Sequence, residues 1–157
     1  MILVLLGTQD KPFSRILNAI QKEIDAKNIT EEVIVQAGIT KFESKNMEIF
    51  SLIANAKYQK LLDKADLVIT HGGVGSIIDA IKKNKKVIAV PRLKEYGEHV
   101  NNHQLEIINH FKEKKYIIAL DDVADLIKKI KQAKKFKPEK YKRNTKNIIK
   151  LIDDFIK

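Results

Sequence analysis

The chain has 157 residues, one domain's worth, of which 44% are hydrophobic and 32% are charged; this is an ordinary soluble globular composition, and the length suffices to bury a core. The absence of cysteine excludes a disulfide scaffold, thiolate zinc sites and thiol catalysis. No apolar run approaches the roughly 20 residues of a membrane span, and the short one at the start does not fit a signal peptide. We therefore expect a cytoplasmic protein.

The net charge of +10 is concentrated near the C-terminus. Between Lys128 and Lys150 stand eleven basic residues and one acidic residue, Glu139, whereas the rest of the chain is neutral. Such a segment indicates a local electrostatic contact, for which anionic lipid headgroups are one natural partner. A solvated lysine-rich helix face is the alternative. Nucleic-acid binding is disfavoured, because only Phe136 and Tyr141 accompany the charge and no reading motif is present.

Short apolar runs alternate with amphipathic stretches, which indicates βα units and a parallel sheet. In chain order we expect a strand at 2–6, a helix at 13–26, strands at 32–36 and 46–52, a helix at 57–64, a strand at 67–70, a helix at 76–83, a strand at 87–90, a helix at 100–113, a strand at 116–119 and a helix at 123–134. A last helix is expected at about 141–156, so that the single domain, 1–157, ends in a basic amphipathic helix within 139–157. The predicted fold is α/β: a Rossmann-like parallel six-stranded sheet with helices on both faces.

Three loops of unusual composition follow expected strands, at residues 7–9, 71–76 and 91–104. In an open parallel sheet, ligands bind beyond the carboxyl ends of the strands, where such loops lie. Because these ends share one edge of the sheet, we expect the three loops to converge on one site.

The strongest local motif is the glycine loop, His71-Gly72-Gly73-Val74-Gly75-Ser76, between an expected strand and an expected helix. Glycines let the backbone approach a ligand closely, and a helix N-terminus offers free amides and a positive dipole end to a phosphate. The loop lacks the Gly-Lys-Ser/Thr ending of a P-loop, and it does not follow the first strand as a dinucleotide motif does. The alternative is a structural turn, with Ser76 as the helix cap and Asp79 completing a capping-box-like pair.

The glycine loop continues as Ile77-Ile78-Asp79-Ala80 and is followed by Pro91 and by Asn102-His103-Gln104. This combination resembles the C-terminal domain of family 28 glycosyltransferases over essentially the whole chain. The short length is similar to stand-alone versions of that domain, the catalytic subunits of dolichol-linked N-acetylglucosamine transfer and of bacterial capsular and exopolysaccharide synthesis. The resemblance implies a single GT-B half, that is, one of the two Rossmann-like domains between which these enzymes work.

The resemblance also implies where a UDP-sugar would bind. Its diphosphate would lie near Gly7 and Thr8 and against the glycine loop. Gly73, Gly75 and Ser76 would stabilise the leaving diphosphate, and no catalytic general base is assigned.

Further roles concern the nucleoside and the sugar. Asp79 stands where a related transferase has a glutamate that binds the ribose hydroxyls, His103 and Gln104 would face the sugar, and Arg92 with residues 95–101 would form the rim. The complete predicted substrate-binding set is Gly7, Thr8, His71, Gly72, Gly73, Gly75, Ser76, Asp79, Arg92, His103 and Gln104.

His99 and His103 are four residues apart, a spacing that can chelate a metal on a helix. The expected helix begins near Val100, so the two side chains need not align, and the sequence has no Asp-x-Asp motif. We expect neither a metal nor a cofactor, because a helix dipole and loop amides can stabilise a departing diphosphate.

Together these features predict the donor-binding subunit of a two-component inverting glycosyltransferase, which moves a sugar from a UDP-sugar to a lipid-linked glycan in polysaccharide biosynthesis. Since 157 residues hold only one Rossmann-like domain, a membrane-anchored subunit with a second such domain would bind the acceptor. The chain would be peripheral at the inner face of the membrane, and its apolar C-terminal helix would recruit the partner. The alternative is a non-catalytic UDP-sugar-binding accessory subunit, since no side chain is an obvious base.

Overall fold

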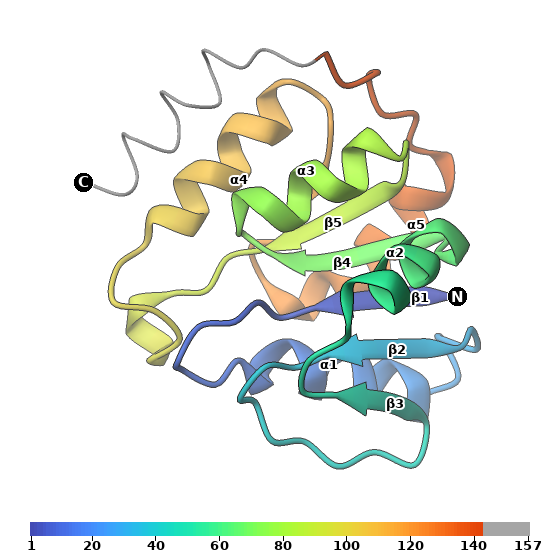
Figure 1. Ribbon diagram of the computed structural model, residues 1–157, viewed down its shortest axis with the longest axis vertical. Coiled ribbons are helices and arrows are strands. Elements are labelled where there is room, and N and C mark those ends of the chain that lie inside the picture. The colour runs from blue at the N-terminus through green and yellow to red at the C-terminus, as the bar shows by residue number, and fades with distance from the viewer. Residues whose placement is uncertain (143–157) are drawn as a thin grey trace.

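A six-stranded parallel sheet forms the centre of the computed structural model, which describes residues 1–142 (Figure 1). The strands are β1 (Ile2–Leu5), β2 (Val33–Gln36), β3 (Met47–Phe50), β4 (Leu67–His71), β5 (Lys86–Val90) and β6 (Ile118–Ala119). Their order, β3-β2-β1-β4-β5-β6, makes β1 and β4 neighbours. The chain reverses its winding between these two strands, as it does in Rossmann-like sheets. The predicted fold class and all six strands are confirmed, although β3 and β6 are shorter than expected.

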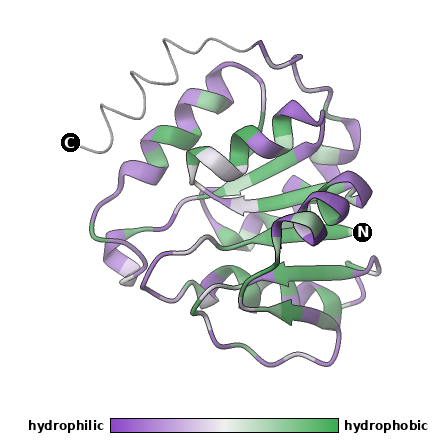
Figure 2. Ribbon diagram, in the orientation of Figure 1, coloured by the Kyte–Doolittle hydropathy of each residue, from purple (hydrophilic) through white to green (hydrophobic). Residues whose placement is uncertain are grey.

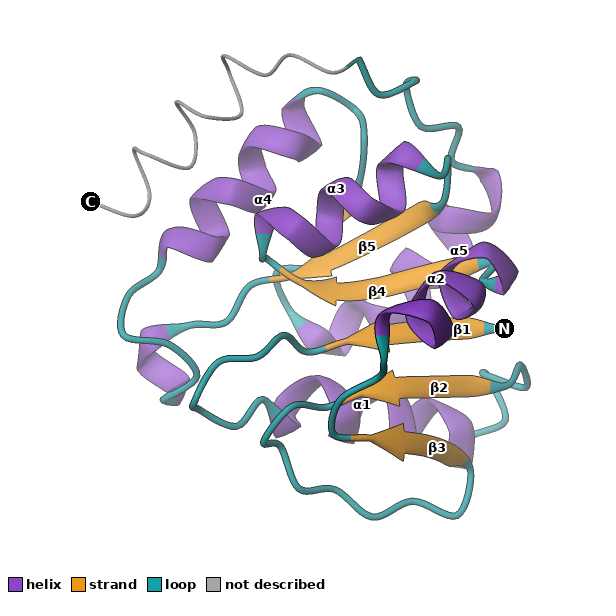
Figure 3. Cartoon of the chain, in the orientation of Figure 1, coloured by secondary structure: helices purple, strands orange, loops and turns teal. Residues whose placement is uncertain are grey.

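Helices cover both faces of this sheet (Figure 3). Residues 1–142 contain α1 (Ser14–Asp25), α2 (Asn55–Lys64), α3 (Val74–Lys82), α4 (His103–Glu113) and α5 (Leu126–Lys135), with 3-10 turns η1 (Lys94–Tyr96) and η2 (Val123–Asp125). The helices α1 and α5 pack on one face, whereas α2, α3 and α4 pack on the other. None of these helices is long and apolar enough to cross a membrane.

Alternate side chains along each strand lie on opposite faces of the sheet and belong to two separate hydrophobic cores. Ile2 and Val4 of β1 pack towards α1 and α5, whereas Leu3 and Leu5 pack towards α2, α3 and α4. All four are nearly inaccessible to solvent, which explains why the strand is a continuous apolar run rather than an alternating one. Figure 2 shows this pattern as hydrophobic strands beneath helices with hydrophilic outer faces.

Some predicted helix boundaries are wrong. The helix α3 begins at Val74 and not at Ser76, so Gly73 is its N-cap and Ser76 lies inside the first turn, where it makes no side-chain cap. The Ser76–Asp79 capping box is therefore also wrong; a glycine can start the helix directly after the strand. Similarly, α4 begins at His103. Of the basic C-terminal helix predicted at 139–157, residues 139–142 are not helical and the remainder lies outside the described residues.

Candidate functional site

The loops that follow β1, β4 and β5 converge as predicted. Gly7, after β1, packs so closely on His71 at the end of β4 that a Cβ on Gly7 would lie 2.6 Å from the imidazole ring. Arg92, after β5, donates from Nε to the carbonyl of Leu6 at 3.2 Å. These contacts join the three loops at the switch point between β1 and β4, where open α/β sheets bind ligands.

The three glycines of the glycine loop differ in the space around them. A Cβ on Gly72 would lie 2.7 Å from Cβ of Gln104, and one on Gly73 would overlap the His71 ring. By contrast, a Cβ on Gly75 would meet nothing within 4 Å. The fold itself thus requires the first two glycines, whereas the space beside Gly75, in the first turn of α3, is open.

The N-terminus of α3 has unpaired backbone donors. The amide of Ile77 donates to the Gly73 carbonyl at 3.2 Å, and the amides of residues 74–76 precede this first donor of the helix ladder, so they have no acceptor within the helix. Free amides and the positive end of the helix dipole favour an anion at this position. The geometry suits a phosphate group.

His71 lies behind this helix start and is only 7% exposed. Burial, reinforced by the positive charge of Arg92, lowers the pKa of His71 to about 4. Its ring nitrogens contact the Nε2 of Gln104 at 3.2 Å and the hydroxyl of Ser76 at 3.5 Å. His71 is therefore neutral at neutral pH and is held from both sides.

A cavity of roughly 340 Å³ opens between the glycine loop and the loop after β5. It is lined by Gln9, His71, Gly72, Gly73, Val74, His99, Asn101, His103, Gln104 and Ile107. Burial, followed by the charge of Arg92, also lowers the pKa of His99. The Nδ1 of His99 accepts the Asn101 amide at 3.3 Å, and the Asn101 side chain accepts the His103 amide at 3.0 Å. These two hydrogen bonds connect the loop after β5, which forms the side of the cavity opposite the glycine loop, to the start of α4.

Two predicted site residues are largely buried. Gln104 is 4% exposed, and its Oε1 accepts the amides of Gly72 and Arg92 at 2.9 and 3.0 Å. It nevertheless lines the cavity, and its contact with a sugar stays a prediction. Arg92 is fully buried and does not form a rim. Its guanidinium donates to the carbonyls of Leu6, Lys11 and Glu98, because a buried charge needs such partners. Both residues hold the loops together from inside.

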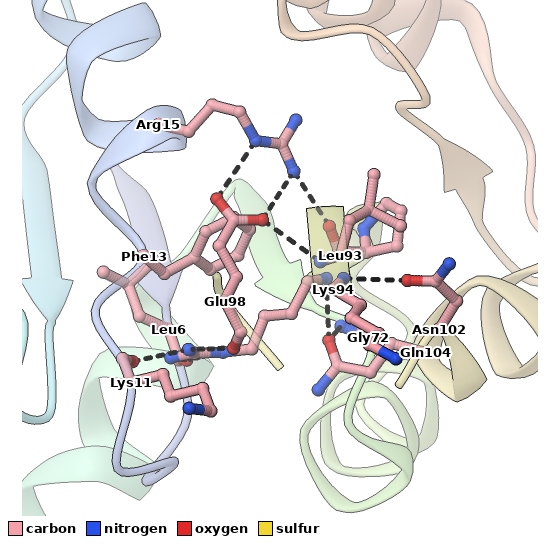
Figure 4. Close-up of polar contacts among 12 residues, drawn as sticks. Leu6, Lys11, Phe13, Arg15, Gly72, Leu93, Lys94, Glu98, Asn102 and Gln104 are labelled. Carbon is pink, nitrogen blue, oxygen red and sulfur yellow. Dashed lines mark hydrogen bonds and ion pairs between the residues drawn. The ribbon is translucent and has the colours of Figure 1, made fainter. Parts of the chain in front are cut away.

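A further network was missed by the sequence analysis. The guanidinium of Arg15 on α1 makes two hydrogen bonds to the buried carboxylate of Glu98, at 3.0 and 3.1 Å, and a third to the carbonyl of Pro91 at 3.0 Å. The same carboxylate accepts the Leu93 amide at 3.1 Å (Figure 4). Arg15 and Glu98 are 83 positions apart in the sequence. Arg15 belongs to no motif, and Glu98, expected at the rim with residues 95–101, is buried. This network fixes the loop after β5 to α1.

Asp79 and Thr8 are both exposed, outside the residues that line the cavity. Asp79 accepts a hydrogen bond from the Tyr58 hydroxyl at 3.2 Å. Burial, together with the charge of Asp79 and this hydrogen bond, raises the pKa of Tyr58. This hydrogen bond orients the Asp79 carboxylate. The assignment of Asp79 to the ribose stays a prediction.

The predicted absence of a metal also stays a prediction. Within residues 1–142, no three His, Cys, Asp or Glu side chains form a group that could hold a metal ion. Glu98, the carboxylate next to His99 in sequence, is occupied by Arg15.

Fold and site together define an open, doubly wound α/β domain with a candidate anion site at its switch point. Over residues 1–157 the sequence matches the glycosyltransferase family 28 C-terminal domain, and the chain belongs to this family. It is 36% identical over 81 residues to the UDP-N-acetylglucosamine transferase subunit ALG13 of Candida albicans. This match covers 52% of this chain and 26% of the relative. To the subunit of the same name from Saccharomyces cerevisiae it is 32% identical over 72 residues, 45% of this chain and 34% of the relative. The match thus spans about a quarter to a third of these relatives.

Solved structures show the same fold. The NMR solution structure of ALG13 superposes with a TM-score of 0.63 at 20% identity, covering 99% of this chain and 96% of that one. The glycosyltransferase SnogD from Streptomyces nogalater superposes with a TM-score of 0.51 at 16% identity, covering 87% of this chain but only 40% of the other. The family resemblance read from the glycine loop is confirmed.

Proposed function

We propose that this chain is the donor-binding subunit of an inverting glycosyltransferase that uses a UDP-sugar. The observation that carries the proposal is the N-terminus of α3, with open space beside Gly75 in its first turn, at the switch point of a family 28 domain. The Candida relative is named a subunit of a UDP-N-acetylglucosamine transferase, which makes UDP-N-acetylglucosamine the first donor to test.

In this proposal the diphosphate binds to the amides of residues 74–76 and the hydroxyl of Ser76. As the acceptor hydroxyl attacks the anomeric carbon, negative charge grows on the departing UDP. Fixed amide dipoles stabilise that charge without reorganising, and a metal is not required for this step. The sugar lies towards His99 and His103, on the opposite wall of the cavity.

The acceptor side is proposed to come from a membrane-anchored subunit with a second Rossmann-like domain. Support comes from the large apolar side chains that are exposed in residues 1–142, namely Ile39, Leu52, Tyr96 and Val100, each at least half exposed. All four lie in loops after the carboxyl ends of β2, β3 and β5, on the edge of the sheet that carries the glycine loop. Exposed apolar residues gathered on one edge indicate a protein interface. A partner docked there would close the cavity and bring a lipid-linked glycan, and the chain would act as a peripheral protein at the inner membrane face, in capsular or exopolysaccharide synthesis.

A non-catalytic accessory subunit is the second candidate. It is favoured by the cavity lining, which contains three histidines but no carboxylate among the described residues. The main proposal assigns the general base to the partner, although histidine side chains such as those of His99 and His103 are also able to act as bases.

Calorimetric titration with UDP and UDP-N-acetylglucosamine, with and without a chelator, tests donor binding. We expect binding that a chelator leaves unchanged; an absolute need for Mg²⁺ or Mn²⁺ would contradict the metal-free mechanism. A transfer assay with a co-expressed membrane partner then separates the two candidates. The donor-subunit proposal predicts that Gly75→Val in this chain abolishes transfer by the pair, whereas an accessory subunit would leave transfer largely intact.

Partner docking is tested separately with Leu52→Asp and Val100→Asp. Both positions are about two-thirds exposed, so neither change should disturb folding or UDP binding. We expect both to weaken co-purification of the partner. Ser51→Asp, at an exposed position adjacent to Leu52, introduces the same charge without removing an apolar side chain and is the matched control. Unchanged co-purification with both variants would remove this edge from the interface.

A further inference from the structure

The orientation of the Gln104 side chain is fixed by backbone groups. Two amide N–H groups, those of Gly72 and Arg92, point at one side-chain atom of Gln104 at 2.9 and 3.0 Å (Figure 4). Since an N–H can donate only to an acceptor, this atom is the carbonyl oxygen Oε1. The amide nitrogen Nε2 is therefore the atom that faces His71.

This orientation determines the tautomer of His71. The Gln104 nitrogen can only donate, so Nδ1 of His71, 3.2 Å away, must accept with a lone pair. Because burial keeps the ring neutral, its single proton lies on Nε2. This nitrogen is 3.5 Å from the Ser76 hydroxyl oxygen, to which it can donate.

We propose that Gln104 and His71 are positioning residues that turn the Ser76 hydroxyl into a directed donor for the phosphate of the ligand. Ser76 Oγ accepts from Nε2 of His71, so its own proton is directed away from the ring. Since Ser76 lies in the first turn of α3, this proton joins the free amides at the helix start. The inference rests on the proposed function, because it names the group that the phosphate meets.

The surrounding glycines explain why the ring can serve this role. Any Cβ on Gly7 or Gly73 would overlap the imidazole of His71. The ring therefore packs closely between the backbones of two loops. Gln104, which lines the same cavity as His71, thus acts on Ser76 through His71.

The tautomer can be measured in the unaltered chain. Long-range ¹H–¹⁵N correlation spectra at neutral pH report which imidazole nitrogen carries the proton. We expect the Nε2–H form for His71, with and without UDP. The Nδ1–H form would overturn the proposed relay, and this result would not depend on whether UDP binds.

Matched substitutions test the effect on the ligand, with UDP and inorganic pyrophosphate as probes. Asparagine at position 71 can still accept from Gln104 but cannot reach Ser76, whereas glutamine places an N–H near the Nε2 position. We expect Ser76→Ala to weaken binding of both probes roughly tenfold, the loss of one hydrogen bond to a charged group. His71→Asn should weaken it several-fold, and His71→Gln should retain most of the affinity.

The decisive comparison is made in the Ser76→Ala background, with melting temperatures as the folding control. If His71 acts through Ser76, His71→Asn causes no further loss of affinity there. An equal loss in both backgrounds would show that His71 acts only through the fold and would overturn the relay. If neither probe binds the unaltered chain, the proposed function itself fails, and the directed Ser76 donor fails with it.

Discussion

Gly75 and Gly73 offer a matched pair of substitutions that separates ligand binding from folding. Both are in the glycine loop, but a Cβ on Gly75 meets nothing within 4 Å, whereas a Cβ on Gly73 overlaps the ring of His71. Alanine and valine at Gly75 should therefore fold normally. Alanine in a helix is intrinsically more stable than glycine by about 0.5–1 kcal/mol, so the melting temperature of Gly75→Ala should not fall.

Ligand binding should respond in the opposite way. Phosphate oxygens must come within about 3 Å of the amides at the start of α3. A valine side chain at Gly75 occupies the approach, and the loss of one charge-assisted hydrogen bond costs about 1.5–3 kcal/mol, or roughly 10- to 150-fold in affinity for UDP. Gly73→Ala should instead lower stability by about 2 kcal/mol through overpacking, and the melting temperature by roughly 4–8 °C.

Differential scanning calorimetry and isothermal titration of the two variants measure these effects. Gly75→Val should bind UDP poorly while melting near the temperature of the unaltered chain. If Gly75→Val binds UDP with unchanged affinity, the phosphate does not sit at the start of α3 and the site is misplaced. Valine at Gly73 should impair folding at least as strongly as binding, because the His71 ring occupies the space it needs.

Three further predictions concern charge. The pKa of His71 is lowered to about 4 in the folded chain, so between pH 6.5 and 4 the unfolded chain binds a proton there and the folded chain does not. The free energy of unfolding should therefore fall over this range by up to about 3 kcal/mol more than that of His71→Asn. The same pH dependence in both proteins would refute this. In urea unfolding, Glu98→Gln should lower the free energy of unfolding by about 2–4 kcal/mol, because Arg15 loses its buried partner. The control Lys64→Gln, in an exposed pair, should change it by less than about 1 kcal/mol. Equal effects would contradict the role of burial. Asp79→Asn should weaken UDP binding by about 1–3 kcal/mol, but should leave binding of 2′-deoxy-UDP unchanged if the carboxylate accepts the ribose 2′-hydroxyl; an equal loss for both nucleotides would exclude that contact.

The strands were predictable because buried parallel strands are continuous apolar runs. The run from Ile2 to Leu6, ended by Gly7, and the run from Leu67 to Thr70, ended by the glycine loop, gave the strand positions and the edge at which the site forms. Residue type and spacing suffice for such features, since they depend on local sequence.

The contacts that could not be predicted join residues that are distant in sequence. Gln104 was expected to contact the sugar, and its oxygen also accepts two backbone amides from other loops. Arg92 was expected at the rim, but carbonyls of the loop after β1 draw its guanidinium inward. Likewise, Glu98 meets Arg15 across 83 residues of sequence. The periodicity of apolar residues along the chain does not indicate these contacts. They could be assigned only from the three-dimensional structure.

The most direct test of the account is a titration of the ¹⁵N-labelled chain with UDP, followed by amide chemical shifts, in the presence of a chelator. The account predicts saturable binding with the largest shifts at Val74, Gly75 and Ser76 and smaller ones at Gly7. Saturable binding that shifts amides elsewhere, or no binding at millimolar UDP, would contradict the claim that the start of α3 is the donor site.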